Sequence, residues 1–147
     1  MGLISNYKVF QDKRFVIEYH EGLGTLEKVI AFKLKEANDP NYSPDYDLLM
    51  DIRKTSISGK KEEAKKYMEF AKTHKGISGH RKLAVITSTP HHVIFFTFLN
   101  MFKIKLPQVM KIFSCVEAAI IWLGEPISVE DANSCIIELK NEAKIYV

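Results

Sequence analysis

Short apolar runs alternate with longer amphipathic segments along this chain. The runs at 46–52 and 83–87 are bounded by turn residues and lie between helical patterns, which is typical of strands inside an α/β sheet. The same periodicities predict strands at 7–10, 14–19, 46–52, 83–87 and 109–113, and helices at 26–37, 60–75, 91–104, 115–123 and 128–143.

The order of these elements indicates the fold class. Two strands come first, and strands then alternate with helices, which favours a mixed, mostly parallel α/β sheet that opens with a β-hairpin and has helices packed on it. We expect residues 1–124 to form one domain. Residues 125–147 would be a C-terminal helical extension that packs on the same domain or on a partner chain.

Two of the expected helices have a clear apolar stripe. In the helix at 60–75 the stripe consists of Ala64, Tyr67, Met68 and Ala71. In the helix at 26–37 the apolar positions are Leu26, Val29, Ile30, Leu34 and Ala37, and we expect this face to be buried.

The segment 93–102 is apolar on nearly every face of its helix. A helix on the surface of a domain should turn polar side chains outward, so its outer face needs a cover. The C-terminal helix could cover it within the same chain, or a second copy, a partner protein or a lipid could do so. The apolar binding surface would consist of Phe95, Phe98, Leu99 and Phe102. Alternatively, these side chains could line a pocket for an apolar small molecule.

Composition and charge exclude several classes of protein. The chain is 46% apolar and 27% charged, and its net charge of +3 is too small to predict nucleic-acid binding. No apolar segment has the roughly 20 residues needed to span a bilayer, and no signal peptide is evident. The two cysteines have neither zinc-ligand spacing nor a disulfide pattern. We expect a cytoplasmic protein without a metal or cofactor.

Polar residues follow two of the expected central strands. Open α/β sheets place their ligand-binding sites at the carboxyl ends of parallel strands, so these residues mark a candidate functional site. This strand-end polar cluster consists of Asp51, Arg53, Thr87, Ser88, His91 and His92. An acid, a base and a nucleophile could be drawn from such a set, but no nucleophile motif surrounds either serine, and helix capping accounts for these groups better.

From about residue 7 to residue 124 the chain resembles the STAS-like, SpoIIAA-like domains of bacteria. The resemblance rests on the opening hairpin, on Gly24 and Thr25, on Asp39 and Pro40, and on the segments 46–53, 83–87 and 117–123. It implies a SpoIIAA-like fold. Many proteins of this type have no assigned role, and better-understood relatives are anti-sigma-factor antagonists, while others bind small ligands or membranes.

The resemblance also implies a candidate switch. The antagonists are phosphorylated on a serine in an Asp-Ser-Ser-Gly turn after the central strand, and residues 54–59 of this chain read Lys-Thr-Ser-Ile-Ser-Gly. Ser58 matches the switch serine best, and Ser56 is the second candidate. An unmodified helix cap is the other interpretation of Ser58.

These observations favour a non-enzymatic regulatory or protein-interaction module that acts through its apolar helix, as a homodimer or with a partner. Two alternatives stay open. One is a carrier for an apolar small molecule or lipid. The other is an enzyme that uses the polar groups at the strand ends.

Overall fold

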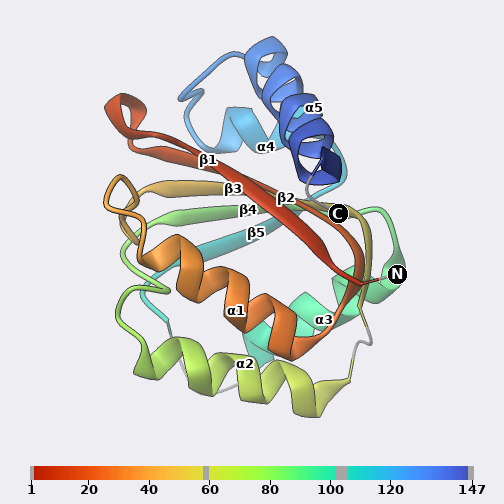
Figure 1. Ribbon diagram of the computed structural model, residues 1–147. Helices are drawn as coiled ribbons and strands as arrows, with labels where there is room; N and C mark the ends of the chain where they lie inside the picture. Colours follow the sequence, from red (N-terminus) through yellow and green to blue (C-terminus); the bar gives the residue numbers. More distant parts are fainter. Residues whose placement is uncertain (1, 58–59, 102–105, 146–147) are drawn as a thin grey trace.

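A five-stranded sheet runs through the centre of the molecule in the computed structural model (Figure 1), which describes residues 2–57, 60–101 and 106–145. Its strands are β1 (Ile4–Phe10), β2 (Phe15–Gly24), β3 (Asp47–Ile57), β4 (Lys82–Ile86) and β5 (Val109–Phe113). The helices are α1 (Leu26–Ala37), α2 (Lys61–Thr73), α3 (Pro90–Met101), α4 (Val116–Trp122) and α5 (Val129–Ile145), and a 3₁₀ turn, Gln11–Lys13, joins β1 to β2.

The strands lie in the sheet in the same order as in the sequence. β1 and β2 form an antiparallel hairpin that closes at the pair Phe10 and Phe15, and β2 to β5 are parallel. Each parallel connection contains a helix, as crossovers between parallel strands require. The mixed, mostly parallel sheet with a leading hairpin that the sequence predicts is therefore confirmed.

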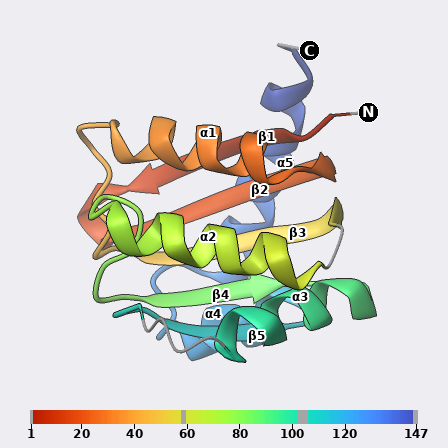
Figure 2. The same ribbon diagram turned by 90° about the horizontal axis from the view of Figure 1, so that it is seen from below.

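The helices form one layer on each face of the sheet. Figures 1 and 2 show α1, α2 and α3 against one face, and α4 and α5 against the other. Each face has its own apolar core, because the alternating side chains of each strand point to opposite sides. In β2, for example, Val16 packs on the α1–α3 side, whereas Phe15 and Ile17 pack on the α4–α5 side.

Helix α5 does not cover α3. It packs on β1, β2 and α4, across the sheet from α3, and its buried side chains include Ala132, Ile136 and Leu139. Cover of residues 93–102 by the C-terminal helix of the same chain is therefore wrong for the described part of α3. The division of the chain after residue 124 stays a prediction.

Helix α1 buries a different face from the one that apolar periodicity predicts. Phe32, Lys33 and Glu36 are buried, whereas Leu34 is 38% exposed. Two charged residues thus occupy the buried face of this helix, and an apolar residue faces solvent. Since burial of charge requires partners, the cause lies in what these residues meet on the sheet.

Strands β2 and β3 extend further than the apolar runs indicate. β3 continues to Ile57, so Arg53 lies within the strand, not at its end. The register shifts where Tyr19 pairs with Asp51 but Glu21 pairs with Lys54, which places two residues of β3 opposite one of β2. This bulge reverses the alternation, and Thr55 and Ile57 consequently face the α1–α3 side.

Candidate functional site

The site lies between β2, β3 and β4 and the layer formed by α1, α2 and α3. Strand alternation points Glu18 and His20 of β2 to the same side as Val16, toward α1. Both polar side chains are at most 5% exposed. A strand that buries both of its faces thus carries two ionisable groups on one of them.

Lys33 of α1 meets Glu18 above the sheet. Its Nζ lies 2.6 Å from Glu18 Oε2 and 3.7 Å from Glu36 Oε1, and His20 Nε2 lies 2.9 Å from Glu18 Oε1. Ser5 Oγ is 2.6 Å from the other ring nitrogen of His20. Glu18, His20, Lys33 and Glu36 are called the buried ionic cluster below.

Strong mutual interactions determine the charges of this cluster. Burial alone would raise the pKa of Glu18, but the Lys33 ammonium and the hydrogen bond from His20 outweigh it, so this pKa lies well below its ordinary value. Burial would lower the pKa of Lys33, yet Glu18 and Glu36 hold it above its usual value. Burial, with the nearby Glu18 carboxylate, raises the pKa of Glu36 well above normal, so the cluster favours one carboxylate and one neutral acid.

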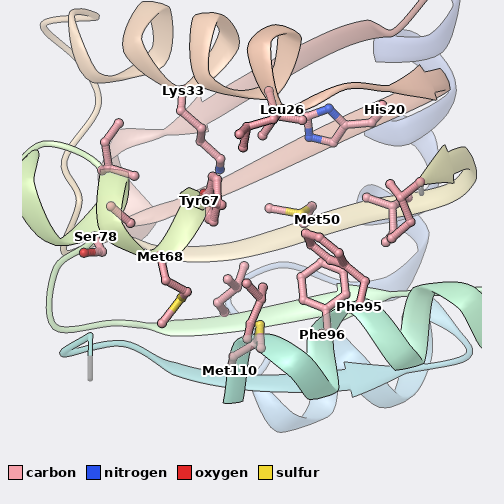
Figure 3. A pocket seen from close by; sticks show the side chains of 18 of the residues that line it. His20, Leu26, Lys33, Met50, Tyr67, Met68, Ser78, Phe95, Phe96 and Met110 are labelled. Carbon is pink, nitrogen blue, oxygen red and sulfur yellow. The ribbon is translucent and has the colours of Figure 1, made fainter. Parts of the chain in front are cut away.

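A cavity of about 310 Å³ adjoins the buried ionic cluster (Figure 3). This volume is at the lower end of the range found for small-molecule sites, which are mostly apolar with a few converging polar groups. The lining side chains that matter below are His20, Lys33, Met50, Tyr67, Met68, Ala71, Ser78, Arg81, Phe95, Phe96, Leu99, Gln108 and Met110. The cavity is thus mainly apolar, with polar groups from α1, from β2 and from the segments that directly precede β4 and β5.

Helix α3 supplies part of the apolar wall. Phe95 and Phe96 pack edge to face with ring centroids 5.4 Å apart, and Figure 3 shows both rings directed toward Met50 of β3. Phe95 and Leu99 of the predicted binding surface line the cavity. Phe102 and the side chain of Phe98 lie outside the described part of the structure. The outer face of α3 exposes Val93 and Ile94.

The strand-end polar cluster divides into two groups. Asp51 is buried, and its carboxylate accepts hydrogen bonds from Nε and Nη2 of Arg53 at 3.0 and 2.8 Å. These bonds raise the pKa of Arg53. The pair lies within β3 and forms a closed two-point contact, so Asp51 has little capacity left to act on a substrate.

The second group connects the start of α3 to β3 through hydrogen bonds. His92 is 1% exposed, and its Nε2 lies 2.6 Å from the carbonyl oxygen of Thr55, while its Nδ1 accepts from the Ser88 N–H at 3.3 Å. A carbonyl only accepts, so Nε2 carries the proton and the ring is held as one neutral tautomer. Ser88 Oγ donates to the Arg53 carbonyl at 2.7 Å. Thr87 is buried, and His91 is exposed.

Of the two candidate switch serines, the structure describes Ser56 alone, and this residue does not lie in a turn. Ser56 is an exposed residue within β3, because the strand runs to Ile57. Ser58 lies outside the described residues. Phosphorylation at either position stays a prediction.

No group of three or more histidine, cysteine, aspartate or glutamate side chains in the described ranges could hold a metal ion. Cys115 is exposed and Cys135 is buried, and neither forms a disulfide. Over the same ranges, no helix has the length and apolar character that crossing a bilayer requires.

Sequence reasoning missed the buried ionic cluster. The signal was present but weak: Lys33 follows Val29 by four positions and Ile30 by three, so it shares their helix face. Glu18 and His20 likewise lie two residues apart in a strand, directly after the apolar run 15–17. Only the pairing of β2 with α1 in space shows that these charges neutralise one another.

Comparison with known proteins gives a fold but no activity. No family model matches the chain, and no curated protein matches it. Among solved structures, the chain is similar to an uncharacterised protein of the DUF3478 family with a SpoIIAA-like fold from Shewanella loihica PV-4. The two are 20% identical with a TM-score of 0.53, and the match covers 83% of this chain and 94% of that one. The five-stranded mixed sheet and this match agree that the chain has the SpoIIAA-like fold that its sequence predicts.

Proposed function

We propose that this protein is a non-enzymatic binding module that holds an apolar small molecule between its sheet and helices α1, α2 and α3. The cavity of about 310 Å³ is the single observation that carries the proposal. The cavity is partly open to solvent and its lining is mostly apolar, so contact of that lining with water is unfavourable. A ligand that fills the cavity would cover this surface and gain dispersion contacts with it.

The strand-end polar groups, which do not line the cavity, support binding over catalysis. His92 is held in one neutral tautomer by its hydrogen bonds to β3 and to Ser88, and Asp51 is engaged by Arg53. Neither group faces a partner that would make it a general base or a nucleophile. The unusual apolar character of α3 has a use in this scheme, since its inner face forms a wall of the site.

A cavity-filling variant tests the proposal. Ala71 lines the cavity and is 2% exposed, and Ala119 is a fully buried alanine in the core on the opposite face. We expect Ala71→Phe to fold with near wild-type stability because the ring enters empty space, whereas Ala119→Phe should cost about 1–3 kcal/mol by overpacking. Binding of a neutral naphthylamine dye, followed by fluorescence, should weaken at least about tenfold in Ala71→Phe, a loss of roughly 1.4 kcal/mol.

Native mass spectrometry of the freshly purified protein is a second readout. A co-purified apolar molecule that is present in the wild type and absent from Ala71→Phe would support the proposal. Unchanged dye affinity in a folded Ala71→Phe protein would contradict it, because the ring then fills no space that a ligand uses.

The outer face of α3 supports a second candidate, association with a second copy or a regulatory partner. Val93 and Ile94 are 44% and 47% exposed there, and adjacent exposed apolar side chains can form part of an interaction surface. Light scattering after size exclusion should give a dimer mass for the wild type and a monomer mass for Ile94→Asp. A monomer for both would remove the homodimer. The cytoplasmic location and the Ser58 switch stay predictions.

A further inference from the structure

Arg81 is a buried cation that has only neutral partners. It lies directly before β4 and is 6% exposed. Its Nη1 donates to Tyr42 Oη at 2.7 Å, its Nη2 to the Ile77 carbonyl at 3.0 Å and its Nε to Gln108 Oε1 at 3.4 Å. Two of the five N–H groups of a guanidinium therefore remain for another acceptor.

The other buried cation of the site is already neutralised. Lys33 Nζ lies 2.6 Å from the Glu18 carboxylate and 3.7 Å from a carboxyl oxygen of Glu36. Among the described residues, no carboxylate forms an ion pair with Arg81. Glu36 interacts electrostatically with Arg81, but burial and the Glu18 carboxylate raise the pKa of Glu36 well above normal, which disfavours its ionised form as a counter-charge for Arg81.

A buried charge of this kind needs compensation. An arginine stays protonated at any physiological pH, so it cannot escape the cost of burial by losing its proton. Arg81 lines the cavity together with Ser78 and Gln108. An anionic group on the ligand would supply both the missing negative charge and acceptors for the remaining N–H groups.

The two phenylalanines of the cavity lie at one end of it, on the same side as His20, as Figure 3 shows. Figure 3 shows Ser78 at the opposite end of the cavity from Phe95 and Phe96. Arg81 is three residues beyond Ser78 and belongs to that end of the cavity. A ligand with one charged head and one apolar tail matches this distribution, and the small volume favours a single chain.

We propose that the ligand is a single-chain apolar carboxylate whose head group is held by Arg81 and whose tail lies against Phe95 and Phe96. This inference rests on the proposed function. A carboxylate is preferred over a phosphate monoester because Arg81 offers one positive charge, while the charge of Lys33 is already taken by Glu18. A dianion would bring a second negative charge close to that carboxylate without a partner for it.

A matched pair of probes tests the head group. Decanoate and decanol have the same chain length, and each can be titrated by calorimetry or by displacement of the naphthylamine dye. On the wild-type protein we expect decanoate to bind at least about tenfold more tightly, as for a charge-assisted hydrogen bond in a buried site. Arg81→Met should abolish this preference and leave decanol binding close to that of the wild type. Lys75→Met, an exposed cation nearby, should keep the preference.

The comparison of decanoate with decanol on the wild-type protein needs no variant, so it remains valid even if Arg81→Met does not fold. In that case Arg81→Lys, which conserves the charge, replaces Arg81→Met. Equal affinities of decanoate and decanol would overturn the carboxylate inference and leave the proposed function intact. Tighter binding of decyl phosphate than of decanoate would also overturn it. If the wild type binds neither decanol, decanoate nor the dye, the proposed function itself fails.

Discussion

Replacement of Lys33 by methionine tests the buried ionic cluster most directly. Lys33 and Glu18 are almost wholly inaccessible, with side-chain exposures of 3% and 0%, and their charged atoms are 2.6 Å apart. Lys33→Met roughly keeps the length and packing of the side chain but leaves the buried Glu18 carboxyl without its cation. Removal of one partner from a buried pair costs about 3–5 kcal/mol, and we expect a loss of that size in the free energy of unfolding.

The second carboxylate makes the two halves of the pair unequal. In Glu18→Gln, Lys33 still has Glu36 at 3.7 Å, and Glu36 is no longer repelled by Glu18. In Lys33→Met, by contrast, two acids lose the cation that they share. We therefore expect Glu18→Gln to be less destabilising than Lys33→Met, and the double variant to recover much of the loss because it leaves no buried charge from this pair.

Urea unfolding followed by circular dichroism gives these free energies, and thermal scans should show a fall in Tm of roughly 10 °C for Lys33→Met. Lys35→Met, on the exposed side of the same helix, is the control. A change of less than about 0.5 kcal/mol in Lys33→Met, the size expected for a surface substitution, would refute the description of this pair as buried and mutually dependent.

The pKa shifts and the rotated face of α1 give two further predictions. The pKa of Glu36 is higher in the folded protein than in the unfolded chain, so above about pH 4.5 folding takes up a proton at this residue. The free energy of unfolding therefore falls as the pH rises, by up to about 1.4 kcal/mol per pH unit. Glu36→Gln should therefore gain stability relative to the wild type between pH 5 and pH 8 in urea titrations, and an equal pH slope for the two would contradict this. Phe32→Ala should cost about 3 kcal/mol whereas Leu34→Lys should be nearly neutral. The opposite ranking in thermal melts would restore the face that apolar periodicity predicts.

The pKa shift of Glu18 is opposite in direction to that of Glu36. Its ionised form is stabilised in the folded protein, so its contribution is present above the ordinary glutamate pKa and is lost as the pH falls toward its lowered value. Acid titration of Glu18→Gln should accordingly be flatter below about pH 4 than that of the wild type, because one of the groups that drive acid unfolding is gone.

The apolar runs of the chain determined most of the fold. Residues 46–52 and 83–87 form short, mostly apolar runs separated by a helical pattern, and a chain of that kind buries such runs in a sheet covered on both faces. The hairpin and the mostly parallel sheet follow from such local patterns, and the SpoIIAA-like architecture follows from the resemblance to that family. The prediction of the apolar stripe of α2 was also correct at Ala64, Met68 and Ala71, which are buried because these apolar side chains pack on the core.

The face of α1 and the partners of Glu18, Lys33 and Arg81 were decided only by the tertiary structure. Periodicity assigns charged residues to solvent, and nothing local indicates that Lys33 meets a carboxylate from a strand fifteen residues earlier. The cavity is also a property of the assembled layers, because its lining comes from three helices and four strands whose separation no single segment specifies. The sequence could show that α3 is too apolar for a solvent-facing helix, but only packing reveals that the inner face of this helix borders an open space beside a charged arginine.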